Sequence, residues 1–135
     1  MKRLLSTKYS EISFSIGIFF LRAATGALLI PHGNMKLQKF AEFVSQFPDP
    51  FHIGSQLSLS LSIFAELFCS IFIILGLFTR FACIPLIINM SVAVIVGHKG
   101  QVFGDGEHAA LYLAIFIALL FTGPGKFSLD KMIGK

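Results

Sequence analysis

The sequence contains no tryptophan, only two tyrosines and only two cysteines, and just 13% of its 135 residues are charged. A soluble domain usually carries about twice that share of charged residues, so the composition argues against a soluble protein of this size. The cysteines, Cys69 and Cys83, form no CxxC pair and show no zinc-ligand spacing. We interpret them as buried apolar residues, which argues against a self-contained thiol–disulfide enzyme.

The residues that are present are mostly hydrophobic, at 55% of the chain, with a mean hydropathy of +0.80. They form long blocks at about residues 12–31, 57–78, 82–97 and 109–123. Backbone groups in lipid must be satisfied internally, so we predict that each block is a transmembrane helix. The sequence thus predicts one domain over residues 1–135, an all-α integral membrane protein built as a four-helix bundle.

The connections between these blocks differ in kind. The first, residues 32–56, contains MKLQKFAEFVSQF, with Leu37, Phe40, Val44 and Phe47 at helical spacing. This pattern predicts an additional amphipathic helix lying in the membrane interface between helices one and two, ended by the prolines of FPDPF. The second connection, around residues 79–81, is short enough to make a tight antiparallel hairpin.

The distribution of lysine and arginine predicts the orientation in the membrane. With four spans, both termini and the second connection lie on one side, which carries seven basic residues against three on the other. The positive-inside rule then predicts both termini in the cytoplasm, with the protein in a bacterial cytoplasmic (inner) membrane. This topology accounts for the net charge of +4, so no nucleic-acid partner is predicted.

Arg22 and Glu66 are charged residues within predicted helices. Each lies nine residues from the predicted outer end of its helix, at Pro31 and Leu57, which corresponds to a depth of roughly 14 Å at about 1.5 Å per residue. An unpaired charge at mid-bilayer costs at least roughly 2.5–3.5 kcal/mol. We therefore predict an Arg22–Glu66 ion pair facing the bundle interior, which serves either catalysis or helix packing alone.

A second set of polar residues lies near the predicted outer ends of the helices. His32 and Lys36 follow the first helix, His98 ends the third, and Glu107 opens the fourth. We predict that these residues, with Asn89 of the third helix, bind a ligand at a hydrophobic mouth. Their spacing matches no metal motif, so no metal is predicted. The structural alternatives are an interhelical hydrogen bond for Asn89 and a helix-dipole contact for Glu107.

Four segments occur in a recognisable order: LRAATGALLIPHGNMKL, AELFCSIFIILGLFTRFA, EHAALYL and GPGKFSLDK. In this order and spacing, over about residues 21–131, the chain resembles the DoxX family of small bacterial membrane proteins. The resemblance implies a four-helix membrane protein and, for some members, a link to thiosulfate:quinone oxidoreduction or to complexes that handle oxidative and thiol stress. The family pattern falls on Arg22, Gly26, His32, Gly33, Lys36, Glu66, Gly76, Thr79, Arg80, His98, Glu107, Gly123, Gly125, Ser128 and Asp130.

Three functions follow from these features. The first is a redox-linked subunit, a component of a quinone-linked oxidoreductase, that binds a quinone or similar lipophilic ligand, with Arg22 or a histidine at the ring oxygen and Glu66 or Glu107 carrying the proton. The second is a non-catalytic anchor that recruits a soluble or membrane redox partner. The third is a small-solute transporter, which would need a homodimer because four helices are few for alternating access.

Overall fold

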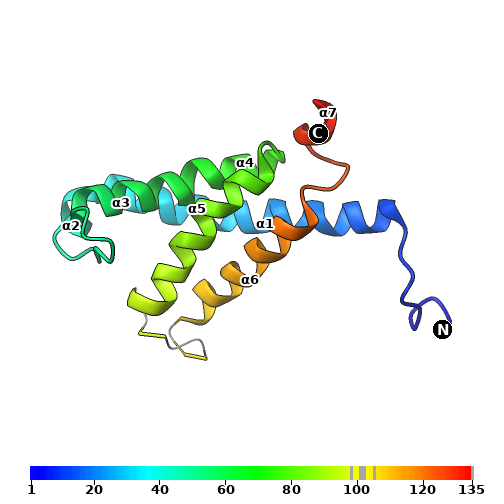
Figure 1. Cartoon of the computed structure of the whole chain (residues 1–135), viewed down its shortest axis with the longest axis horizontal. Helices are drawn as coiled ribbons and strands as arrows, with labels where there is room; N and C mark the ends of the chain where they lie inside the picture. The colour runs from blue at the N-terminus through cyan, green and yellow to red at the C-terminus, as the bar shows by residue number, and fades with distance from the viewer. Residues whose placement is uncertain (98, 101–102, 105, 135) are drawn as a thin grey trace.

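The computed structural model describes residues 1–97, 99–100, 103–104 and 106–134, and within these the regular structure is entirely helical. Figure 1 shows the arrangement of the helices. The elements in chain order are α1 (Glu11–Gln38), α2 (Phe40–Val44), α3 (Ser55–Ile63), the π-helical η1 (Phe64–Cys69), α4 (Ser70–Leu75), α5 (Thr79–Val92), the π-helical η2 (Ala93–Gly97), α6 (Glu107–Thr122) and α7 (Leu129–Met132).

Three helices are long and apolar enough to cross a membrane. They are α1, the continuous helix Ser55–Leu75 formed by α3, η1 and α4, and the helix Thr79–Gly97 formed by α5 and η2. The fourth apolar helix, α6, is shorter at 16 residues. These lengths confirm the predicted all-helical membrane protein, because about 20 apolar residues span a hydrocarbon core.

Helix α1 is longer than the sequence pattern predicted. It begins after Ser10, whose hydroxyl accepts a hydrogen bond from the N–H of Ser13 at 3.1 Å. The end predicted at Pro31 is wrong, since the helix continues to Gln38 with Pro31 on its exposed side. A proline removes one backbone donor, and a long helix packed along its length tolerates this loss. Lys36 therefore belongs to α1, and the separate amphipathic helix is reduced to the five residues of α2.

The reversal between α4 and α5 is as tight as predicted. Gly76 ends α4 in the left-handed region at φ 69°, and Phe78, at φ 48°, immediately precedes α5. A side chain at Gly76 would collide with Ser128 and the guanidinium of Arg22. Glycine is therefore required here both for its backbone conformation and for the space it leaves.

The helices pack as two neighbouring pairs. Helix α1 runs antiparallel beside α3–η1–α4, and α5 pairs with α6 (Figure 1). The start of α1, the α4–α5 turn and the end of α6 lie toward one end of the molecule, while α2 lies toward the other (Figure 1). The buried core comprises Ile18, Leu29, Ala65, Cys69, Ile73, Ala82, Cys83, Leu86, Met90, Val94, Ala109, Phe116 and Leu119.

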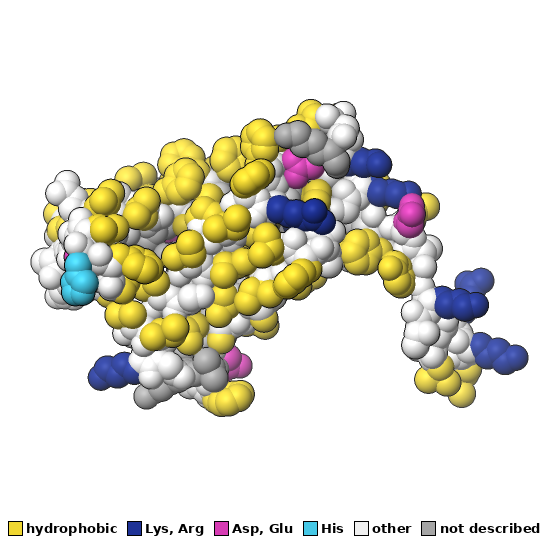
Figure 2. All heavy atoms as spheres, in the orientation of Figure 1, with side chains coloured by type: hydrophobic (Ala, Val, Ile, Leu, Met, Phe, Trp, Pro, Cys, Tyr) yellow, Lys and Arg dark blue, Asp and Glu magenta, His cyan; other side chains and the backbone are white. Residues whose placement is uncertain are grey.

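The outer surface is apolar over most of the helices. Figure 2 shows hydrophobic side chains covering the visible face, with lysine and arginine side chains gathered toward the end that carries both termini. Phe81 and Phe121 are 75% and 79% exposed, respectively. Such a surface would be costly in water and is suited to contact with lipid. Cys69 and Cys83 are free and buried in the core, as predicted from their apolar surroundings.

Candidate functional site

Arg22 is fully buried, with only 1% of its surface exposed, and it does not pair with Glu66. Its Nε donates to the carbonyl of Ile73 at 2.9 Å and its Nη2 to that of Ile74 at 2.9 Å. Its Nη1 donates to the carbonyls of Pro124 and Phe127, both at 2.8 Å. The predicted Arg22–Glu66 ion pair is therefore wrong, because backbone carbonyls at the end of α4 and after α6 satisfy the guanidinium.

The register between α1 and the second membrane helix explains this difference. Gly26 packs closely against α4, and Gly33 packs against the backbone of Glu66. Because α1 extends beyond its predicted end, Lys36 is the residue that reaches Glu66, and Arg22 lies further along the bundle. The depth estimate assumed matched outer helix ends, and that assumption failed for α1.

The segment after α6 is fastened to the same region as Arg22. The carboxylate of Asp130 accepts hydrogen bonds from the N–H groups of Phe78 at 2.8 Å and Thr79 at 3.0 Å. The N–H of Asp130 donates to the carbonyl of Gly76 at 2.9 Å. Asp130 thus caps the start of α5, while Arg22 holds the preceding residues. This arrangement has a clear structural role and occupies four of the five N–H groups of Arg22 with backbone carbonyls.

The second buried polar cluster centres on Glu66. Its Oε1 lies 2.9 Å from Nζ of Lys36 and accepts a hydrogen bond from Nδ2 of Asn89 at 3.2 Å. Lys36 also donates to the hydroxyl of Ser62 at 3.0 Å. The other carboxylate oxygen, Oε2, is buried and has no hydrogen-bond partner among the described residues. The cluster therefore combines a held charge pair with one buried acceptor that is unsatisfied.

Glu66 is carried by the π-helical segment η1. A π-turn is wider than an α-turn and is found often at functional sites, where it shifts side chains from their regular helical positions. Gly33 permits the close approach of α1 here, because a Cβ at Gly33 would lie 3.0 Å from the backbone nitrogen of Leu67. The local structure thus brings Lys36 within reach of the carboxylate.

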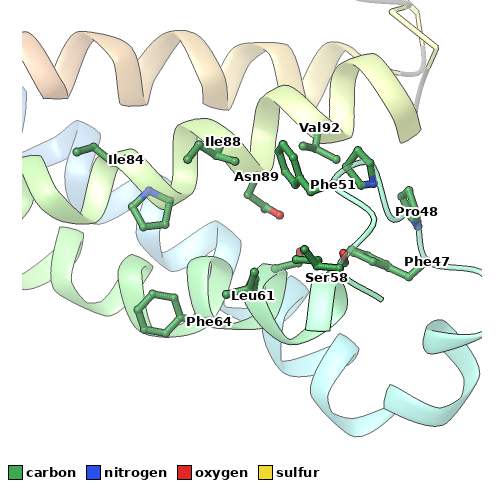
Figure 3. Close-up of a pocket in the computed structure, with 14 residues that line it drawn as sticks. Phe47, Pro48, Phe51, Ser58, Leu61, Phe64, Ile84, Ile88, Asn89 and Val92 are labelled. Atoms are coloured by element: carbon green, nitrogen blue, oxygen red, sulfur yellow. The ribbon is translucent and has the colours of Figure 1, made fainter. Parts of the chain in front are cut away.

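An apolar pocket of about 250 Å³, drawn in Figure 3, shares Ser62 and Asn89 with this cluster. Its walls come from α3, η1, α5 and the loop before α3, and the side chain of Asn89 points toward it (Figure 3). Asn89 and Ser62, which contact the charge pair, are two of its few polar lining residues. The full lining is Phe47, Pro48, Pro50, Phe51, Ile53, Ser58, Leu61, Ser62, Phe64, Ile84, Pro85, Ile88, Asn89 and Val92.

Asp49 fastens the loop that forms one wall of this pocket. Its Oδ1 accepts hydrogen bonds from the hydroxyl of Ser58 at 2.9 Å and the N–H of Ile53 at 3.0 Å, and its Oδ2 accepts one from the N–H of Gly54 at 2.8 Å. Desolvation acts to raise the pKa of Asp49, but these hydrogen bonds outweigh it and hold the pKa below its ordinary value. The loop is thus closed over the pocket by an ionised carboxylate.

The structure brings together only part of the predicted ligand-binding set. Lys36 and Asn89 meet at Glu66. His32 on α1 and Glu107 in the first turn of α6 are exposed, and neither takes part in the hydrogen bonds of this cluster. His98 lies outside the described residues.

Sequence reasoning missed Ser62 and the loop wall of the pocket. A signal for Ser62 was present, because Ser58, Ser62, Glu66 and Ser70 recur every fourth residue and all four are buried on one face of the second membrane helix. No comparable signal marks the loop, whose prolines and phenylalanines indicated only the end of a helix.

Comparison with known proteins supports the family resemblance. The model of the DoxX family matches residues 17–99. An uncharacterized protein of Haemophilus influenzae is 33% identical over 123 residues, covering 86% of this chain and 90% of its own length. An uncharacterized membrane protein of Mycobacterium tuberculosis is 36% identical over 84 residues, covering 52% of each chain. No solved structure matches the chain.

Proposed function

The chain belongs to the DoxX family, and on that premise we propose that it binds a quinone or similar lipophilic ligand in the pocket beside Glu66, as a redox-linked subunit. The observation that carries the proposal is the contact between an apolar pocket of about 250 Å³ and the polar cluster formed by the buried Glu66 with the half-buried Lys36 and Asn89. Ligand sites combine mostly apolar walls with a few convergent polar groups, and this pocket has that composition.

Each part of a quinone finds a suitable environment in this pocket. The aromatic side chains of Phe47, Phe51 and Phe64 offer an apolar surface for the ring and its isoprenoid tail. Asn89, and Lys36 behind it, supply N–H groups for a ring oxygen. Arg22, which the sequence suggested for this role, donates four hydrogen bonds to backbone carbonyls elsewhere and does not line the pocket, so it is not part of the proposed site.

Glu66 is the group proposed to exchange protons with the ligand. Reduction of a quinone to a quinol takes up two electrons and two protons, and a carboxyl group close to the ring oxygens shortens the path of one proton. The electrons would come from a partner redox protein, in keeping with the link to thiosulfate:quinone oxidoreduction that the resemblance implies for some members of the family. The free Oε2 of Glu66 gives the carboxyl group capacity to accept a proton while Oε1 stays paired with Lys36.

The proposed setting is the inner membrane of a bacterium. The four apolar helices form a transmembrane bundle with both termini in the cytoplasm, and α2 with the loop after it lies in the outer interface. The pocket then opens close to the outer face, between α3 and α5, where a lipophilic ligand enters from the bilayer.

The test is to purify the protein in mild detergent, extract it with organic solvent and quantify quinone by mass spectrometry. We expect near-stoichiometric quinone in the wild type and a large loss in Glu66→Gln and in Leu61→Trp, which fills the pocket without altering the polar cluster. Leu75→Trp is the matched control, because Leu75 is similarly exposed on the same helix, at 45% against 51%, but does not line the pocket.

Two results would redirect the interpretation. Quinone retained equally in Leu61→Trp would place the ligand elsewhere. An absence of quinone from every sample, together with a soluble protein that co-purifies in fixed stoichiometry, would favour the anchor function instead.

A further inference from the structure

A second cavity lies at the opposite end of the molecule from α2, beside the start of α5. Its volume is about 360 Å³, and it is more polar than the pocket near Glu66. It is walled by the α4–α5 turn, the end of α6 and the segment that follows α6. The lining is Phe78, Thr79, Arg80, Phe81, Thr122, Pro124, Gly125, Asp130 and Lys131.

Two cations, Arg80 and Lys131, line this cavity, and both are exposed. Within the described part of the chain, the guanidinium of Arg80 donates one hydrogen bond, a long one of 3.5 Å from Nη2 to the carbonyl of Phe121. Gly123 makes room for this guanidinium, because a Cβ there would lie 3.1 Å from Nη2 of Arg80. Arg80 is thus placed over the end of α6 with most of its N–H groups available to an anion.

The charge balance of the cavity is positive. Asp130 also lines it, but its carboxylate caps the start of α5 and lies near the buried cation of Arg22. Arg80 and Lys131 therefore outnumber Asp130 among the charged lining residues, and the charge of Lys131 also acts on Glu11. The hydroxyl of Thr79 belongs to the same wall and is buried without a hydrogen-bond partner among the described residues.

Two strongly exposed phenylalanines lie at this cavity or beside one of its lining residues in the chain. Phe81 is 75% exposed at one side and Phe121, next to the lining residue Thr122, is 79% exposed. An anion bound in this cavity would therefore lie beside the exposed side chains of Phe81 and Phe121, which can contact acyl chains. A free phosphate matches only the cations, whereas a phospholipid matches the cations and the phenylalanines together.

We propose that this cavity binds the phosphate group of an anionic phospholipid, with Arg80 and Lys131 contacting the phosphate and Phe81 and Phe121 contacting the acyl chains. Basic pockets between membrane helices at the water interface bind anionic lipid headgroups in this way. The site is separate from the pocket at Glu66, so it stands whether or not that pocket binds a quinone.

The test uses the full-length protein in mild detergent and native mass spectrometry with added phosphatidylglycerol or phosphatidylcholine. We expect retained phosphatidylglycerol to exceed phosphatidylcholine in the wild type. At about 1 kcal/mol for each basic residue, the double variant Arg80→Gln/Lys131→Gln should bind phosphatidylglycerol about 30-fold more weakly. Arg80→Lys/Lys131→Arg, which keeps both charges, should retain most of the binding.

The matched control is Arg3→Gln/Lys8→Gln, which removes the same charge from the N-terminal arm at the same end of the molecule. It should leave phosphatidylglycerol binding unchanged. Equal loss in this control would overturn the proposal in favour of general charge attraction, and equal retention of the two lipids would overturn it as well. Displacement of the lipid by millimolar inorganic phosphate would show that the cavity recognises free phosphate and would overturn the assignment to a lipid.

Discussion

Lys36 of α1 and Glu66 of η1 form an ion pair between two membrane helices, with Nζ 2.9 Å from Oε1. The exposed fractions of the two side chains are 19% and 7%, so water screens the pair only slightly. In such a setting, loss of one partner leaves the other charge without compensation, and the cost of that charge exceeds the net contribution of the pair.

The first prediction concerns the difference between removing one partner of this ion pair and removing both. Lys36→Met should destabilise the protein by about 3 kcal/mol, because Glu66 then remains buried without a cation. The double variant Lys36→Met/Glu66→Gln should be less destabilised than the single variant, since the buried charge is gone. A double-mutant cycle, measured by equilibrium unfolding in mixed micelles, determines the coupling. Lys39→Met is the control at an exposed neighbouring position, and additive effects of the two substitutions would contradict the ion pair.

The second prediction concerns the packing of α1 on α4. Gly26→Ala should lower the free energy of unfolding by about 1–3 kcal/mol, because the added methyl group meets Ile74 and lies 2.8 Å from the carbonyl oxygen of Ser70. Gly17→Ala is the control on the same helix, since nothing lies within 4 Å of a Cβ there. Equal thermal stability of the two variants in detergent would show that α1 does not pack as described.

These two sites show what the sequence predicted and where the prediction failed. The apolar blocks identified every long helix, since lipid requires backbone groups to be satisfied within the helix. The end of α1 was placed at Pro31, which put Arg22 level with Glu66. A stripe at alternating spacings of four and three residues continues through the proline, and it was the better guide. Its members are Arg22, Gly26, Leu29, Gly33 and Lys36.

The remaining features depend on contacts that have no local signature. Arg22 donates to carbonyls of residues 51 to 105 positions away in the chain, which no helical periodicity reveals. The cap that Asp130 provides for α5 joins residues 51 and 52 positions apart. The pocket wall formed by Phe47 and Phe51 also depends on how a proline-containing loop folds back. Such contacts follow from tertiary packing, and the sequence pattern alone does not specify them.

The third prediction concerns Arg22 and the segment after α6. Arg22→Lys keeps the charge but cannot reproduce four donors in a planar fork, so at least one charged hydrogen bond is lost, at a cost of about 2 kcal/mol. We expect the amide of Asp130, which donates to Gly76, to exchange with deuterium about 30-fold faster. Arg80→Lys is the control at an exposed arginine. Unchanged exchange at Asp130 would mean that Arg22 does not hold this segment.

The fourth prediction concerns the pH range over which Asp49 closes the loop beside the pocket. Because hydrogen bonds hold its pKa below the ordinary value of 3.8, the ionised form is favoured in the folded loop. Its stabilising effect should be complete at pH values above the ordinary pKa and should be lost as the pH falls through the lower pKa of the folded state. Carboxyl NMR titration in micelles should therefore give Asp49 a pKa below 3.8.

Substitution of Asp49 separates the effect of its carboxylate charge from the effect of the loop backbone. Asp49→Asn removes the carboxylate that accepts from the N–H groups of Ile53 and Gly54, so protection of these amides from exchange should fall at pH 7. In Asp49→Asn, the protection of these two amides should also be independent of pH over the range in which the wild type loses it. Glu42→Gln, an exposed carboxylate on α2, should leave both properties unchanged. Equal protection in wild type and Asp49→Asn at pH 7 would show that the backbone of the loop, rather than this carboxylate, keeps the pocket wall in place.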